Sequence, residues 1–189
     1  YADRDILVVN KRAGMAMYET YNHHGNALSN AVAAAGFDGP FRPIYRLDKD
    51  TSGLVVLARH QLSAAKLAGK VQKDYYAVVP GTYTGSGTVD APIAHCPDST
   101  VKRCVDPAGV RAVTHWEALG QQGGRTLLRV QLETGRTHQI RVHFAHLGTP
   151  LVGDSLYGTA PIGARHLLHC KTIRLMHPVR EEPRSEEHT

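Results

Sequence analysis

The sequence predicts a single α+β domain built on a mixed, mainly antiparallel sheet that helices and loops flank. Three observations support this class. Short β-branched runs outnumber segments with helical spacing, glycine-containing turns of hairpin length join neighbouring runs, and no Pro-, Gly- or Ser-rich linker separates two cores. With 189 residues, of which 42% are apolar and 21% are charged, the chain is long enough to bury one substantial core.

The elements of the first half follow from their patterns. Residues 6–10 are a β-branched run that indicates a buried strand. Residues 26–36 have helical spacing, with Asn26 placed as the N-cap and Gly36 just past the end. The same reasoning predicts a strand, a helix and a strand over residues 54–58, 62–72 and 75–79. The apolar faces expected for the two helices are Leu28, Ala31, Val32 and Ala35, and then Leu62, Ala65, Ala68 and Val71.

The second half is expected to hold one hairpin and one helix between loops. Strands over residues 113–119 and 126–132 flank a glycine-rich hairpin turn at 120–124. Helical spacing then returns at Ile140, Phe144 and Leu147, and Gly148 ends that helix. Because the last residues are polar and charged, we expect the domain to cover residues 1–178 and a frayed tail to cover 179–189. Loops are predicted over 81–87 and 92–109.

The charge balance suits a polyanionic partner. The net charge is +5, and without the last ten residues the chain has 20 basic and 13 acidic residues, a difference of +7. RNA fits this balance, although many other globular proteins are equally basic. Three cysteines without paired spacing favour reduced thiols, and the apolar runs are too short to span a bilayer. We therefore expect a cytoplasmic protein with no membrane partner.

A carboxylate lies between two cations in the segment from Arg46 to Gly53. In an extended chain Arg46 and Asp48 project to one side, and the positive neighbours favour the ionised form of Asp48. Gly53 allows a sharp turn into the next strand, so Asp48 is a candidate catalytic carboxylate on a rigid element. The competing interpretation is a surface turn with a loose salt bridge, which the pattern alone favours.

A second polar segment runs from Glu133 to His143. Its Gly-Arg-Thr sequence opens the last predicted helix, where backbone N–H groups and the helix dipole attract phosphate, and Arg136 adds charge there. His138 and Arg141 are expected on one side of this helix, where the guanidinium can form a bidentate pair with a carboxylate or phosphate. An amphipathic helix with a solvated face is the alternative.

Together these segments resemble the motifs of the RluA-class pseudouridine synthases. That family carries Arg-Leu-Asp-x-x-Thr-Ser-Gly, Lys-x-Tyr-x-Ala, Gly-Arg-Thr-His-Gln-Ile-Arg-Val-His and Gly-Asp-x-x-Tyr-Gly segments. The chain is similar to all four, in that order, over residues 46–53, 73–77, 135–143 and 153–158. The resemblance implies a pseudouridine synthase catalytic domain, an isomerase that converts uridine to pseudouridine in structured ribosomal or transfer RNA. It implies no cofactor, no metal and no protein partner, and we expect a monomer.

The resemblance also implies roles for single residues. Asp48 matches the essential aspartate, which is the nucleophile or base, and Tyr75 matches the tyrosine that packs on the uracil ring. Arg141 matches the arginine that pairs with that aspartate, and Arg46 the arginine that fills the space of the flipped base. Tyr45 stands where the family usually has histidine. RNA contacts are expected from Arg46, Arg136, Thr137, His138, Gln139 and Ile140.

Other classes of function compete with this interpretation. A metal enzyme would use histidine pairs, but zinc-like Cys-x-x-Cys or His-Glu-x-x-His spacing is absent, which favours core histidines or RNA contacts. A non-catalytic RNA-binding module would stack bases on tyrosines, yet it gains nothing from Asp48 facing phosphates. A carboxylate glycosidase needs two paired acids. The histidine pairs are His143/His146 and His166/His169, and the tyrosines are Tyr18, Tyr21, Tyr75 and Tyr76.

Overall fold

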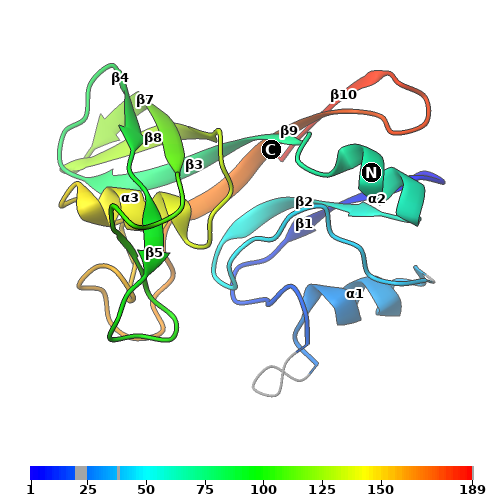
Figure 1. The fold of residues 1–189 in the computed structure, drawn as a ribbon, viewed down its shortest axis with the longest axis horizontal. Coiled ribbons are helices and arrows are strands. Elements are labelled where there is room, and N and C mark those ends of the chain that lie inside the picture. Colours follow the sequence, from blue (N-terminus) through cyan, green and yellow to red (C-terminus); the bar gives the residue numbers. More distant parts are fainter. Residues whose placement is uncertain (20–24, 38, 189) are drawn as a thin grey trace. The chain divides into compact units, whose positions relative to one another are not determined.

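The structure, a computed structural model, describes residues 1–19, 25–37 and 39–188 (Figure 1), and Tyr21 lies outside these ranges. The chain forms two compact units, one from residues 1–73 and 170–189 and the other from residues 74–169. It passes from the first unit to the second within strand β3 (Gln72–Pro80) and returns within strand β9 (Leu168–Met176). The predicted α+β class with mainly antiparallel pairing is confirmed.

The first unit is built on strands β1 (Ile6–Lys11) and β2 (Ser52–Ala58), which confirm two predicted strands. They pair antiparallel, with Ile6 opposite Ala58 and Lys11 opposite Gly53. Every residue of β2 is buried, so this strand is the centre of the unit. β9 follows β2 in the strand order and also pairs antiparallel with β10 (Pro183–Glu187).

Neither β9 nor β10 was predicted, and the expectation of a frayed tail is wrong for residues 183–187. In β9 the alternation of buried Leu168 and Cys170 breaks at Lys171 and Thr172 before it resumes at Ile173, which hides the strand period. β10 carries mostly polar side chains and depends on pairing with β9, from Pro183 opposite Met176 onward. Main-chain pairing of this kind leaves no signal in the local sequence.

Helices α1 (Leu28–Ala34) and α2 (Gln61–Leu67) are shorter than predicted. Ala27, and not Asn26, is the N-cap of α1, and Leu28 is the buried residue of that helix. The apolar face predicted for α2 is wrong, because its buried residues are Ser63 and Leu67. The His60 ring accepts the Ser63 N–H and so fixes where α2 begins, and α2 then packs against β2.

The second unit contains four neighbouring antiparallel strands in the order β3–β8–β7–β4, which lie side by side in Figure 1. Their bounds are β4 (Ser86–Asp90), β7 (Val113–Gln122) and β8 (Arg125–Leu132). The predicted β7–β8 hairpin is confirmed, and its turn is Gly123–Gly124, with φ of 58° and 69° as a two-residue type I′ turn requires.

A small hairpin and a helix complete the second unit. Strands β5 (Ile93–His95) and β6 (Arg103–Val105) pair within a segment that was predicted to be a loop. The predicted helix is α3 (Gln139–His146), which packs against β6 and β7. Within the described ranges, no helix is long and apolar enough to cross a bilayer.

Candidate active site

Asp48 lies in the loop that enters β2. Arg46 is exposed, Leu47 is buried and Asp48 is half-buried, as expected for an extended segment whose side chains alternate. The N–H of Thr51 donates to the Asp48 carbonyl oxygen at 3.1 Å and closes the turn that precedes β2. The carboxylate therefore lies directly before a fully buried strand.

A buried lysine holds this loop in place. Lys11, the last residue of β1, is 0% exposed, and its Nζ donates to the carbonyl oxygens of Arg12, Met15 and Lys49 at 3.1, 2.8 and 2.9 Å. A buried ammonium is costly unless such acceptors replace its water. The bond to Lys49 fixes the backbone next to Asp48. No role was predicted for Lys11, although a lysine at the end of a β-branched run is itself a signal.

Two further residues fix β2 where the loop joins it. Gly53 has a φ of +120°, and a Cβ atom at this position would lie 2.3 Å from the carbonyl oxygen of Cys170, so only glycine fits. The Tyr45 hydroxyl donates to the carbonyl oxygen of Leu54 at 2.9 Å, and the Lys73 ammonium lies 4.6 Å from the centre of its ring. Tyr45 therefore supports the strand that follows the Asp48 loop.

In the second unit, Arg141 of α3 forms a buried, bidentate ion pair with Asp154. Its Nε donates to Oδ2 at 2.7 Å and its Nη2 to Oδ1 at 3.0 Å, and the two side chains are 8% and 0% exposed. Burial raises the pKa of Asp154, but the hydrogen bonds and charge of Arg141 and two backbone N–H groups outweigh it and hold the pKa below its usual range. The pairing of Arg141 with Asp48 stays a prediction.

Tyr157 connects this ion pair to the turn before α3. The guanidinium carbon of Arg141 lies 5.0 Å from the centre of the Tyr157 ring, and the Tyr157 hydroxyl lies 2.7 Å from Nδ1 of His138. His138 is the N-cap of α3 and has a φ of 58°, a left-handed value that residues other than glycine seldom adopt. Asp154 and Tyr157 thus connect two of the predicted site residues, Arg141 and His138. The Gly-Asp-x-x-Tyr-Gly segment was the signal for them, but no role was assigned.

Gln139 and Ile140 are buried and support the same turn from inside. Gln139 Oε1 accepts from the Thr134 hydroxyl at 2.9 Å and from the Arg136 N–H at 3.0 Å, while Nε2 donates to the Val113 carbonyl at 2.9 Å. All residues from 139 to 144 are buried, so the interpretation of α3 as a helix with a solvated face is wrong. Arg136 and Thr137 are exposed, as an RNA contact requires.

Tyr75 lies in the middle of β3 and is 5% exposed, opposite Val130 of β8. The next residue, Tyr76, is half-buried and lies opposite Arg129, and the two rings point to opposite faces because side chains alternate along a strand. Tyr75 belongs to the second unit with Arg141, whereas Asp48 belongs to the first. Their common role in one site stays a prediction.

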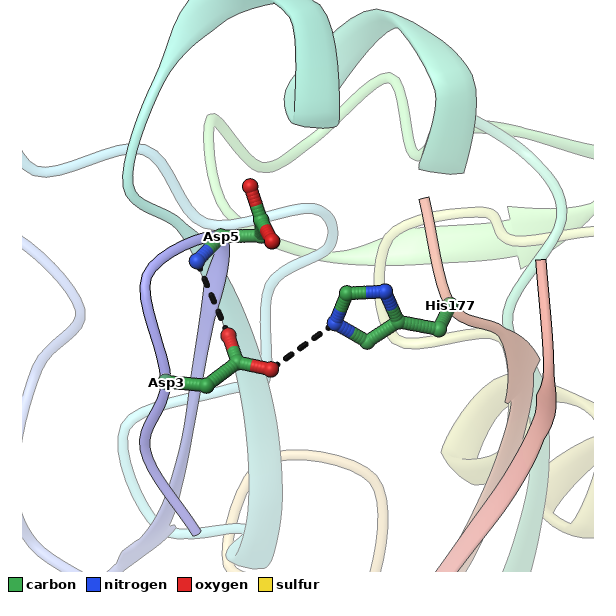
Figure 2. Close-up of side chains that lie close together, drawn as sticks. All are labelled: Asp3, Asp5 and His177. Carbon is green, nitrogen blue, oxygen red and sulfur yellow. Dashed lines mark hydrogen bonds and ion pairs between the residues drawn. The ribbon is translucent and has the colours of Figure 1, made fainter. Parts of the chain in front are cut away.

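One cluster within residues 1–19, 25–37 and 39–188 has the composition of a metal site, namely Asp3, Asp5 and His177 (Figure 2). Its hydrogen bonds argue against metal binding. His177 Nδ1 accepts the N–H groups of Val179 and Arg180 at 3.3 and 3.0 Å, so Nε2 carries the proton that faces Asp3 Oδ2 at 2.8 Å. A metal ligand would have to lose that proton. The cluster instead ties the N-terminal segment to the segment after β9.

The histidine pairs that suggested a metal enzyme are also explained by packing. His143 is 0% exposed, with Nδ1 at 2.8 Å from the Thr114 hydroxyl and Nε2 at 3.0 Å from the Ala91 carbonyl oxygen. Burial lowers its pKa, which favours the neutral ring. His166 is buried and His146 is exposed, and neither pair gathers a third ligand in the described part of the chain.

The segments that form these arrangements match a known family model. The model describes RNA pseudouridylate synthases and matches residues 5–146, which include Asp48, Tyr75 and Arg141. The chain belongs to the RNA pseudouridylate synthase family. The predicted family is thereby confirmed.

Individual family members are similar over most of the chain. It is 39% identical over 193 aligned residues to the uncharacterized RNA pseudouridine synthase YjbO of Bacillus subtilis. This alignment covers 96% of this chain and 68% of that protein. It is also 39% identical over 207 aligned residues to the ribosomal large subunit pseudouridine synthase D of Xanthomonas campestris pv. campestris. This second alignment covers 97% of this chain and 62% of that protein. Across four such relatives, the chain spans 58% to 68% of their length.

A solved structure supports the same family. The human RNA pseudouridylate synthase domain containing 1 is 25% identical and superposes with a TM-score of 0.82, covering 100% of this chain and 81% of that one. The two chains therefore share the fold as well as part of the sequence.

Proposed function

We propose that this chain catalyses the isomerisation of uridine to pseudouridine in structured RNA, with Asp48 as the essential carboxylate. The observation that carries the proposal is the anchoring of the Asp48 loop by Lys11 in the region that matches the family. A catalytic group gains from a fixed position, because a small displacement of the reacting atoms lowers the rate strongly. A surface turn with a loose salt bridge would not need a buried ammonium bonded to its backbone.

The reaction conserves atoms and electrons, so it requires neither a redox cofactor nor a second substrate. The bond from ribose to the ring nitrogen breaks, the uracil turns, and a bond from ribose to a ring carbon forms. That carbon loses its proton, and the freed ring nitrogen gains one. Asp48 acts either by attacking the ribose or by accepting a proton. The target uridine must leave the base stack, at a cost of about a few kcal/mol that RNA contacts offset.

The other roles follow the family pattern. Tyr75 packs on the uracil, Arg46 fills the space of the flipped base, and Arg141 holds Asp48 in its ionised form. A guanidinium has five N–H donors, so its pair with Asp154 does not prevent a second carboxylate from binding. The exposed residues Arg46, Arg136 and Thr137 bind RNA directly, as does His138, whereas Gln139 and Ile140 act through the turn that they support.

The proposed substrate is ribosomal RNA of the large subunit, and the protein acts as a monomer in the cytoplasm. The names of several relatives, ribosomal large subunit pseudouridine synthase D, favour this substrate. Transfer RNA is the alternative, and mapping of pseudouridines in total RNA with and without the gene distinguishes the two.

The test of catalysis is release of tritium from the ring carbon that becomes the new attachment point. Wild-type protein should release tritium from RNA without added metal or cofactor. Asp48→Asn, which keeps the shape but loses the carboxylate, should bind the same RNA within about tenfold and release none. Asp50→Asn, the matched change two residues away, should stay active. If Asp50→Asn were inactive and Asp48→Asn active, Asp48 would not be the essential residue; if neither mattered, the enzyme proposal would fail.

A further inference from the structure

Asp154 and Tyr157 contact the second unit's predicted site residues but have no role in the proposed chemistry. Asp154 is 1% exposed, and besides Arg141 its Oδ1 accepts the N–H groups of Leu156 and Tyr157 at 2.9 and 3.0 Å. The carboxylate is therefore held by its own backbone before it binds the guanidinium. This rigidity distinguishes it from a flexible surface partner.

Close backbone contacts at two glycines flank Asp154. A Cβ atom at Gly153, where φ is +82°, would lie 2.1 Å from the Arg165 carbonyl oxygen. A Cβ atom at Gly158 would lie 2.7 Å from the Asp154 carbonyl oxygen. Larger residues fit at neither position, so the backbone on both sides of Asp154 packs closely against neighbouring backbone.

Two contacts hold the planar guanidinium of Arg141, one along its edge and one over its face. Its long side chain has several freely rotating bonds, and the bidentate pair with Asp154 fixes the plane of the guanidinium. The Tyr157 ring covers one face of that plane at 5.0 Å. Tyr157 is in turn packed against the buried cluster of Ile93, Ala112 and Val142, and this packing restricts movement of its ring.

Tyr157 also restrains His138 in an unfavourable backbone conformation. Left-handed φ values cost of the order of 1 kcal/mol for residues with a Cβ and persist where surrounding contacts demand them. The Tyr157 hydroxyl accepts the Arg103 N–H at 3.0 Å and lies 2.7 Å from His138 Nδ1. When the hydroxyl donates to Nδ1, the neutral imidazole carries its proton on Nε2.

We propose that Asp154 and Tyr157 are positioning residues for the isomerisation: Asp154 orients the guanidinium of Arg141, and Tyr157 orients the imidazole of His138, before RNA binds. This inference rests on the proposed function for its effect on turnover. The orientation of Arg141 and His138 is a property of the protein alone and can be measured without activity.

The first test compares Asp154→Asn with Asp90→Asn. Asp90 is an exposed aspartate of the same unit that pairs with Arg111 at 3.4 Å. Asp90→Asn is therefore the same substitution made at an exposed side chain. Asp154→Asn should lower kcat by about 100-fold with KM within about threefold, the loss expected for a misplaced catalytic group. Asp90→Asn should leave both within about twofold. In NMR, hydrogen exchange of the Arg141 Nε–H should be at least about tenfold faster in Asp154→Asn than in wild type, because its acceptor is weakened.

A double variant separates positioning from a general structural role. If Asp154 acts through Arg141, Asp154→Asn should lower kcat by less than about twofold when added to Arg141→Lys. A full additional loss of about 100-fold would mean that Asp154 acts independently of Arg141 and would overturn this half of the proposal.

The second test substitutes Tyr157 and does not depend on Asp154→Asn being folded. Tyr157→Phe keeps the ring against Arg141 but removes the hydroxyl, so kcat should stay within about threefold while KM for RNA rises by about tenfold. Tyr157→Leu loses the ring as well and should lower kcat by about tenfold or more. Equal effects of Phe and Leu on both constants would overturn the assignment.

The outcomes distinguish this inference from the proposed function. If wild-type protein released no tritium, the function would fail, while the exchange rate of the Arg141 Nε–H would still report whether Asp154 orients it. If Asp154→Asn accelerated that exchange but turned over normally, the function would stand and the positioning role would fail. Unchanged exchange in Asp154→Asn would also overturn the positioning role, whatever the activity.

Discussion

Replacing Lys11 by methionine tests whether a buried cation positions the Asp48 loop. Methionine keeps the unbranched apolar stem of the side chain but removes the ammonium that donates to the carbonyl groups of Arg12, Met15 and Lys49. Each of these partly buried carbonyl groups costs up to about 1 to 3 kcal/mol when it is left without a donor. Relief from burying an ammonium offsets part of that sum, because a buried ion itself costs several kcal/mol. We therefore expect a net loss of about 2 to 4 kcal/mol in the free energy of unfolding.

Lys11→Met should also lower the catalytic rate, because one of the three lost hydrogen bonds holds the backbone beside Asp48. Urea unfolding measures stability, and tritium release measures kcat at a temperature where the variant is folded. We expect kcat to fall by about tenfold or more and KM to change little. Lys66→Met is the matched control, since Lys66 is an exposed lysine of the same unit and pairs with Glu181 at 3.6 Å; it should change stability by less than about 0.5 kcal/mol. A stable Lys11→Met protein with normal turnover would refute the anchoring argument.

Three further predictions follow from the same structure. Arg141→Lys keeps the charge but loses the bidentate fork, so kcat should fall by about 100-fold while a filter-binding assay finds RNA affinity nearly unchanged; activity within a few-fold of wild type would remove Arg141 from the site. Gly53→Ala adds a Cβ atom 2.3 Å from the Cys170 carbonyl oxygen and forces a φ of +120° on alanine. Thermal unfolding should therefore show a loss of about 3 kcal/mol or more in the free energy of unfolding. The control Gly120→Ala, where a Cβ atom would have nothing within 4 Å, should lose less than about 1 kcal/mol. RNA affinity should fall by about 100-fold between 50 and 200 mM salt, as expected for several phosphate contacts, and a flat response would contradict an electrostatic interface.

Local patterns determined which segments carry chemistry and what kind of element most of them form. The β-branched run of β1, the glycine turn of the β7–β8 hairpin and the apolar spacing of α3 depend on residues that are close in the chain, so the sequence alone predicted them. The alternation around Leu47 also follows from local geometry, and the structure has Leu47 buried between the exposed Arg46 and the half-buried Asp48. Motif order was enough to identify the family.

Tertiary structure decided what depends on residues far apart in the chain. Gly53 is required because the backbone of Cys170 approaches it, and Arg141 is buried with Asp154, thirteen residues away, rather than on a solvated helix face. β10 is a strand only because β9 offers it hydrogen bonds. The three carbonyl groups that hold Lys11 come from two separate turns. A sequence pattern records the polarity and period of one segment, whereas burial and ion pairing arise when segments meet, and that is the physical reason these features could not be read in advance.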